Sequence, residues 1–394
     1  MAVSSQLRSF DVAVVGAGLT GLAATLGFAR AGFNVACIGR PERGGPGRTV
    51  ALLGRTLDFL ESLDVLAAVE RQAAPLRVLR IVDDTGSLFA PRPVEFRASE
   101  MGRDVFGWNI ENAILARLFG ETRRLETDVA GFAFAGEAAE LTLSDGNSVT
   151  AKLVVGADGR GSASRKAAGI DMTERRAGQT ALTLSLRHER PHGDASTEFH
   201  TREGPFTLVP LPPAPGAPHR SSLVWLMREA SAARRLALSD AELASEVRAG
   251  AHAMLGDVEI ESGRGAFAMT MQRVARLTAP RLALVGDAAH AFPPIGAQGL
   301  NLGLRDVAEI VAATVQARAE GADFGGAATL DGYAARRRPD IALRTLGVGA
   351  FNASLLASFW PVDALRGLGL AALGAAAPLR RLAMREGLNP FLAR

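Results

Sequence analysis

The segment VAVVGAGLTG, residues 12–21, decides the fold class. Its first four residues are apolar and mostly β-branched, which predicts a buried parallel strand, and three glycines follow in the spacing Gly-x-Gly-x-x-Gly. Residues 19–31 have the apolar spacing of a helix that stops at Gly32, and residues 34–38 are predicted as a second strand. Strand, glycine turn, helix and strand in this order form a βαβ unit, so the sequence predicts a doubly wound α/β fold.

The three glycines suit the binding of a dinucleotide. Gly16 permits a tight turn, Gly18 lets the backbone approach a pyrophosphate, and Gly21 allows the helix to pack closely on the strand. The N-terminus of the helix then attracts the phosphates. An acid normally ends the second strand and binds the adenosine ribose, but Gly39 and then Arg40 stand there. Since an arginine here can indicate NADP, the turn alone leaves FAD, NAD and NADP open.

Composition excludes several classes of protein. The 394 residues suit two or three domains, and 48% hydrophobic with 22% charged residues is ordinary globular composition. A net charge of +3 and 6% aromatic residues argue against nucleic-acid binding. The single cysteine, Cys37, excludes an internal disulfide and a multi-cysteine metal site, and we expect no metal. The first ten residues are polar and carry no signal-peptide pattern, so we expect a cytoplasmic protein.

Two further patterns lie inside the first half of the chain. Helices are predicted over residues 55–72 and 112–125 from their apolar spacing. Two strands joined by a tight turn at Asp145-Gly146 are predicted around residues 141–155.

The alternation typical of antiparallel strands begins near residue 180. Residues 206–211 and 221–226 are predicted as a hairpin across a proline-rich loop, and residues 266–272 as a further strand. The buried-strand pattern returns at 281–286 and precedes a long helix over 300–320. We therefore expect an antiparallel sheet inserted into the dinucleotide-binding domain.

The end of the chain is unusually apolar. Residues 345–362 carry no charge and approach the length of a membrane span, but Asn352, Pro361, glycines and serines argue against a span. Two alternatives remain open: packing against the protein's own domains, or a surface that faces a membrane or a partner. The second gains support from flanking arginines at 344, 366, 380, 381 and 385. Arg336-Arg337-Arg338 is expected at a solvated helix end, where a contact with anionic lipid is the alternative.

Two later motifs narrow the choice of cofactor. Gly156-Ala157-Asp158-Gly159-Arg160 and Gly286-Asp287-Ala288-Ala289-His290 each follow a predicted buried strand. At the carboxyl end of a parallel strand, Asp287 can accept a hydrogen bond from a sugar-alcohol hydroxyl such as a ribityl group. The rigid turn PPIGAQGLN, residues 293–301, then enters the long helix, where N–H groups and the helix dipole can face the anion of a reduced flavin.

Taken in this order, the motifs resemble those of the class A flavin-dependent aromatic hydroxylases related to p-hydroxybenzoate hydroxylase. The resemblance spans nearly the whole chain and is greatest to the hydroxylases of ubiquinone biosynthesis. The run GAQGLNLGLRD, residues 296–306, is similar to the signature of that branch. Two positions depart from the family's pattern: Gly296 and Ala297 stand in the reverse order, and Gly39 replaces the ribose-binding acid.

The resemblance implies FAD as the cofactor and assigns residues to it. It also implies three parts of the chain. A discontinuous FAD-binding domain comprises residues 1–75, 100–179 and 273–340, and a substrate domain comprises residues 76–99 and 180–272. Residues 341–394 form a C-terminal helical segment. The residues expected to bind FAD are Gly16, Gly18, Gly21, Arg48, Asn112, Asp158, Gly286, Asp287, Gly299, Leu300 and Asn301. Those expected to line the flavin ring are Pro293, Gly296, Ala297 and Gln298. His290 is a candidate acid or base, although a histidine at the end of a buried strand is more often structural.

The implied activity is oxygen transfer to an aromatic ring. NAD(P)H or another donor would reduce FAD, O₂ would form a C4a-hydroperoxide, and one oxygen would pass to a prenylated phenol in a site that excludes water. We expect a peripheral protein on the inner face of the membrane, within a biosynthetic complex. Three alternatives remain open: a hydroxylase of a small soluble aromatic compound, a flavin-binding scaffold subunit without oxygen chemistry, and an NADP-dependent reductase.

Overall fold

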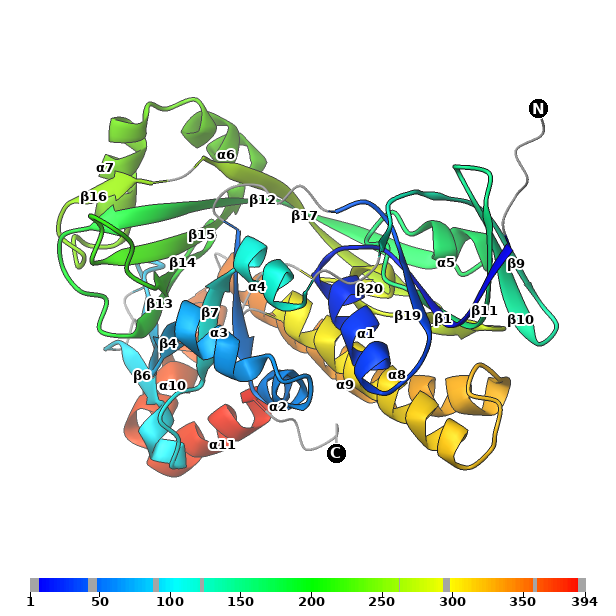
Figure 1. Ribbon diagram of the computed structural model, residues 1–394. Helices are drawn as coiled ribbons and strands as arrows, with labels where there is room; N and C mark the ends of the chain where they lie inside the picture. The colour runs from blue at the N-terminus through cyan, green and yellow to red at the C-terminus, as the bar shows by residue number, and fades with distance from the viewer. Residues whose placement is uncertain are drawn as a thin grey trace.

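The structure is a computed structural model that describes residues 7–41, 48–87, 92–120, 124–261, 263–292, 298–356 and 360–388. Five parallel strands form the centre of its first sheet (Figure 1). β1 (Leu7–Val15) pairs with β2 (Val35–Ile38) on one side and β11 (Ser148–Gly156) on the other, and β8 (Arg124–Leu125) and β19 (Leu282–Leu284) extend the sheet. Numbered along the chain, these strands lie in the order 3-2-1-4-5 of a doubly wound fold, which confirms the predicted fold class.

Helices cover one face of this sheet. α1 (Leu19–Arg30) packs on α8 (Gln298–Ala319), and α8 packs on α9 (Ala327–Leu356). Fully buried side chains pack between these helices and the sheet, among them Phe28 of α1 and Tyr333 of α9. Tyr333 also donates its hydroxyl to the carbonyl of Leu284, 2.8 Å away, and so joins α9 to β19.

The hairpin predicted around Asp145-Gly146 is present. β10 (Ala138–Leu143) pairs antiparallel with β11, and β9 (Val129–Ala135) continues the sheet beyond it. β18 (Thr278–Ala279) closes the opposite edge.

The second sheet is the predicted antiparallel one except for a single parallel pair, β13 with β5, and it is longer than the sequence indicated. β12 (Met172–His188) and β17 (Gly265–Val274) are its longest strands, and they pair antiparallel from Met172 with Val274 to Thr183 with Gly265 (Figure 1). α6 (Glu229–Leu236) and α7 (Asp240–Gly250) cover one face of this sheet. The other strands are β20 (His290–Ala291), β15 (Arg220–Arg228), β14 (Gly204–Leu211), β13 (Ala195–Thr201), β5 (Val78–Asp83), β6 (Val94–Arg97) and β16 (Val258–Ile260).

Two predicted helices differ from the structure. The helix expected over 55–72 is broken into α2 (Arg55–Ser62) and α3 (Leu66–Gln72), because Asp64 lies between them with a φ of +57°. The helix expected over 112–125 ends early as α4 (Asn112–Leu118), and Gly120, with a φ of +85°, follows it. The remaining elements are β3 (Thr49–Leu53), β4 (Ala74–Leu76), β7 (Gly107–Glu111), α5 (Ala163–Ala167) and the 3₁₀ turns η1 (Ala98–Met101) and η2 (Gly286–Ala288).

The last helices that the structure describes are α10 (Trp360–Ala375) and α11 (Ala377–Leu388), which pack beside β6 (Figure 1). Leu370 and Met384 are buried there against Phe96. Arg380 donates to both carboxylate oxygens of Glu100, so this part of the C-terminal segment packs on the protein itself. Among the residues described, no helix combines the length and the apolar character needed to cross a membrane.

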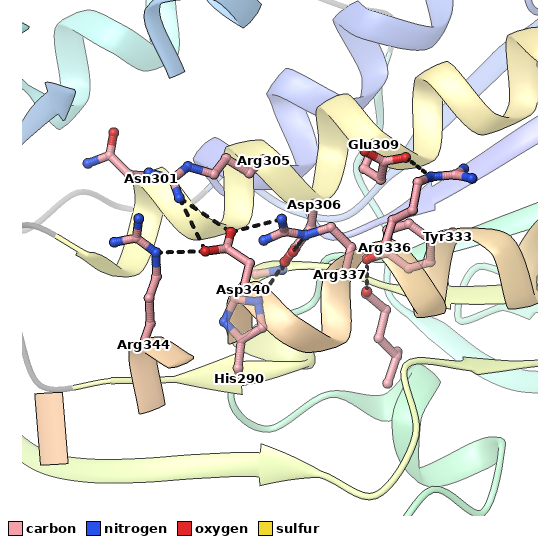
Figure 2. Close-up of polar contacts among 12 residues, drawn as sticks. His290, Asn301, Arg305, Asp306, Glu309, Tyr333, Arg336, Arg337, Asp340 and Arg344 are labelled. Atoms are coloured by element: carbon pink, nitrogen blue, oxygen red, sulfur yellow. Dashed lines mark hydrogen bonds and ion pairs between the residues drawn. The ribbon is translucent and has the colours of Figure 1, made fainter. Parts of the chain in front are cut away.

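The expectation for Arg336-Arg337-Arg338 was wrong, because these residues lie inside α9 rather than at a helix end and the central one belongs to a buried cluster of charges (Figure 2). The outer two arginines are exposed, but Arg337 is buried and donates to Asp306 at 2.7 Å and to Asp340 at 2.9 Å. Burial by itself would raise the pKa of Asp340, but Arg337, Arg305 and Arg344 together lower it to about 2. The central arginine was mispredicted because the helical turn that carries it faces α8.

We predict that Asp340→Asn strongly destabilises the fold, because it leaves buried arginines without their anion. The free energy of unfolding should fall by about 3–5 kcal/mol at neutral pH. Since the folded-state pKa of Asp340 lies below its ordinary value of 3.8, its contribution is present above pH 4 and is lost as the pH falls toward 2. The difference in the free energy of unfolding between wild type and variant should therefore become smaller as the pH falls from 4 toward 2. Urea denaturation measures it, with Asp331→Asn, an exposed aspartate of α9, as the control; equal losses in both variants would contradict the prediction.

Candidate active site

One cavity of about 900 Å³ runs from the glycine turn after β1 to the face of the antiparallel sheet. Its first part lies at the carboxyl ends of the parallel strands, where doubly wound folds bind their ligands. Its second part is lined by strands of the antiparallel sheet. The predicted FAD-binding residues that line this cavity are Gly16, Gly18, Arg48, Asn112, Asp158, Asp287, Gly299 and Leu300.

The glycine turn is shaped for a phosphate. Gly16 has a φ of +115°, and a Cβ there would lie 2.3 Å from the carbonyl oxygen of Ala157. A Cβ on Gly21 would lie 1.9 Å from the carbonyl oxygen of Gly16, so Gly21 serves helix packing and lies outside the cavity lining. α1 begins at Gly18 without a side-chain cap, and its first residues line the cavity. Their N–H groups are therefore available to an anion.

Gly39 has a structural reason to be glycine. Its φ is +151°, and a Cβ would lie 3.0 Å from the backbone nitrogen of Ala17. An acidic side chain at this position would strain the glycine turn after β1. Arg40, which follows, forms an ion pair of 3.4 Å with Asp128, and both residues line the cavity.

Two polar side chains fit the flavin end of the cofactor. Asp287 follows the carboxyl end of β19 and is half exposed to the cavity, 3.4 Å from the guanidinium of Arg160. Asn112, at the start of α4, has a buried Oδ1 that lacks a hydrogen-bond partner within the part of the chain that the structure describes. A buried amide oxygen of this kind normally has a partner, so a hydroxyl or N–H of bound FAD fits there.

Other predicted residues hold the site together. Both carboxylate oxygens of Asp158 accept hydrogen bonds, one from Ser162 and the other from Ser164. Asn301 accepts from the N–H of Leu53 at 3.0 Å and donates to the carbonyl of Ala51 at 2.7 Å, so it fastens the start of α8 to β3.

Gly286 and His290 also lie outside the cavity lining. Gly286 has a φ of +58° and packs against the side chain of Thr20. His290 is buried with its Nε2 2.6 Å from Asp306, which supports a structural role (Figure 2). Pro293, Gly296 and Ala297 lie outside the described residues, and of Gln298 only the backbone, at the start of α8, is described.

Sequence reasoning missed the far end of the cavity. Strands β5, β12, β13, β14, β15 and β17 line it with one face of the antiparallel sheet. Alternation along each strand shows that two faces differ, but only the topology shows which face meets the glycine turn. The apolar side chains of this end are Leu79, Ile81, Val209, Val224, Phe267 and Met269, and the polar ones include Thr183, Ser196, Glu198 and Thr207.

His188 and His192 have a spacing that is also found in metal sites. Both ring nitrogens of His188 are engaged, with the carbonyl of Arg190 at 2.8 Å and the hydroxyl of Ser221 at 3.0 Å. His192 accepts a hydrogen bond from the N–H of Asp194. Within the described residues, no group of three or more histidine, cysteine or acidic side chains is arranged to hold a metal.

Comparison with known proteins agrees with this geometry. The family model of the FAD binding domain matches residues 9–344. The chain belongs to this family. It is 35% identical to ubiquinone hydroxylase UbiL of Rhodospirillum rubrum, over 96% of this chain and 89% of the relative. It is 30% identical to 3-demethoxyubiquinol 3-hydroxylase of Escherichia coli, over 96% of this chain and 98% of the relative. The protein is thus a flavin-dependent aromatic hydroxylase with FAD as its cofactor.

Solved structures support the same fold at lower sequence identity. p-Nitrophenol 4-monooxygenase PnpA from Pseudomonas putida is 18% identical to this chain, with a TM-score of 0.76. The alignment covers 97% of this chain and 99% of PnpA. PqsL of P. aeruginosa in complex with 2-aminobenzoylacetate is 23% identical with a TM-score of 0.75, over 92% of this chain and 100% of its own.

We predict that Asp287→Asn weakens FAD binding without unfolding the protein. The change removes a charged acceptor that is half exposed at the cavity, so the dissociation constant of FAD should rise about 10-fold or more. Titration of the apoprotein, followed by quenching of flavin fluorescence, measures this constant. Asp331→Asn, which is remote from the cavity, should bind FAD as the wild type does. An unchanged constant for Asp287→Asn would remove Asp287 from the FAD site.

Proposed function

We propose that the protein hydroxylates the ring of a polyprenylated phenol in ubiquinone biosynthesis, with NAD(P)H or another donor as the reductant. The observation that carries this proposal is the apolar end of the cavity, continuous with the FAD site. Aliphatic and aromatic side chains from several strands line it, and such a lining suits a prenylated ring. The names of the two relatives above add support, since one is a ubiquinone hydroxylase and the other a 3-demethoxyubiquinol 3-hydroxylase.

The chain's own residues bind, orient and keep out water. Bound FAD supplies oxygen activation and the transfer of one oxygen atom to the ring. The glycine turn holds the pyrophosphate, and Asp287 and Asn112 orient the flavin side chain. The apolar walls of the antiparallel sheet limit the access of water, which protects a reactive oxygen donor from unproductive decay.

A small aromatic carboxylate is a weaker candidate substrate. Such a compound needs a cation at the substrate end, where Arg48 lies over the ring of Phe267 at 5.2 Å and β5 contributes Arg80. The guanidinium of Arg80 is already paired with Glu95 at 2.9 Å. The unpartnered Oδ1 of Asn112 and the continuous cavity also favour an enzyme over a scaffold that has lost its chemistry.

We propose further that α10 and α11 bring the enzyme to the membrane surface. Leu368, Leu379 and Leu382 are 68%, 48% and 54% exposed on these helices. Arg381 and Arg385 are exposed beside them. Exposed leucines next to arginines suit the interface of an anionic bilayer, where a prenylated phenol is dissolved.

One experiment tests the activity and the membrane contact together. Purified holoenzyme, NADPH and ¹⁸O₂ are mixed with 2-geranylphenol, either in vesicles of phosphatidylglycerol and phosphatidylcholine or dispersed in detergent. We expect a product with one ¹⁸O atom in both media. The double variant Leu379→Asp/Leu382→Asp should lose most of its turnover on vesicles, because charged residues oppose insertion, and keep it in detergent.

The control is Leu236→Asp, which changes a comparably exposed leucine of α6. It should behave as the wild type in both media. NADPH oxidation without O₂ consumption would instead favour a reductase. Equal loss of turnover in both media for the double variant would contradict the membrane contact.

A further inference from the structure

A single row of side chains crosses the cavity face of the antiparallel sheet. Strand pairing places Glu198 opposite Thr207, Thr207 opposite Val224, and Val224 opposite Thr183. Ile81 lies on the other side of Glu198. Paired residues point to the same face of a sheet, and all five of these line the cavity. The row therefore sets one carboxylate and two hydroxyls into walls that are mostly apolar.

Glu198 is fixed in position by two neighbours. Its Oε1 lies 2.9 Å from Nε2 of His200, which is fully buried, and its Oε2 lies 3.3 Å from the hydroxyl of Thr207. A carboxylate only accepts hydrogen bonds, so His200 donates through Nε2–H and Thr207 donates through its hydroxyl. These two bonds leave part of the acceptor capacity of Glu198 unused, and its side chain remains 18% exposed.

Thr183 adds a second polar group to this row. Its Oγ1 is buried and has no hydrogen-bond partner among the residues that the structure describes. Buried hydroxyls normally find a partner in the protein, in water or in a ligand. Because Thr183 lines the cavity, a ligand oxygen can supply that partner.

We propose that Glu198 accepts the hydroxyl hydrogen of the phenolic substrate and thereby selects neutral phenols, with Thr183 receiving or donating the hydrogen bond of a second ring oxygen. This assignment rests on the proposed function, because it names the group that recognises the substrate of that same cavity. His200 and Thr207 are positioning residues that hold the carboxylate.

The chemistry of a carboxylate explains the selection. An O–H group can donate to the unused acceptor sites of Glu198, whereas a methyl ether cannot and leaves those sites without a donor. A substrate carboxylate would face a like charge. A phenol that donates to an anion also gains electron density on its ring, which favours attack by an electrophilic oxygen.

The test compares 2-geranylphenol with its methyl ether, 2-geranylanisole, as ligands of the FAD-loaded enzyme. Dissociation constants come from the change in flavin absorbance on binding. We expect the wild type to bind the phenol about 10-fold or more tightly than the ether, as for a hydrogen bond to a charged group. In Glu198→Gln this preference should fall to about threefold or less, with KM for the phenol rising more than kcat falls.

The matched control is Glu259→Gln, an exposed glutamate of β16 at the far end of the same sheet. It should keep the wild-type preference. The wild-type ratio alone already tests the claim without any substitution: equal binding of phenol and ether, or binding of neither, would overturn it. An unchanged ratio in Glu198→Gln would overturn it as well. A wild type that prefers the phenol but forms no hydroxylated product would refute the proposed hydroxylation and leave the role of Glu198 standing.

Discussion

The site depends on the hydrogen bonds that the buried carboxylate of Asp306 accepts. From α8 it accepts hydrogen bonds from the N–H of Gly286 at 3.0 Å, from Nε2 of His290 at 2.6 Å and from Arg337 at 2.7 Å. Burial would raise its pKa, but His290, Arg337 and the hydrogen bonds keep the pKa below its ordinary value. One carboxylate thus joins three segments to α8: η2, which follows β19, the strand β20, and α9. Removing one partner from such a cluster strongly destabilises the fold, because a charge is left buried without compensation.

This constraint brings two sheets with different tasks to one cavity. The parallel sheet ends in backbone N–H groups and Asp287, which suit a dinucleotide with a flavin. The antiparallel sheet supplies apolar walls and one row of polar side chains, which suit a ring with oxygen substituents. β17 of this sheet pairs with β20, which follows β19 of the parallel sheet after the turn η2, so this stretch of chain joins the two sheets. Hydroxylation of a prenylated phenol is the proposal that uses both ends.

The sequence predicted the parts of the fold that depend on local pattern. The βαβ unit, the hairpin at residues 145–146 and the fold class are confirmed, because apolar periodicity and glycine turns are local signals. The break at Asp64 was missed because a left-handed residue leaves no periodic mark. The capping box of Ser239 and Glu242 could have revealed α7, whereas burial of Arg337 and the cavity row of Glu198 depend on long-range packing. Gly39 was visible as a departure, but its cause, the approach to Ala17, needs coordinates.

The most direct measurement of the central claim is a mass spectrum of the quinone fraction after deletion of the gene in its own host. The account predicts loss of ubiquinone and accumulation of a prenylated phenol that lacks one oxygen, with restoration by the wild-type gene. The mass of the intermediate would also identify the step. Unchanged ubiquinone, with no such intermediate, would contradict the account.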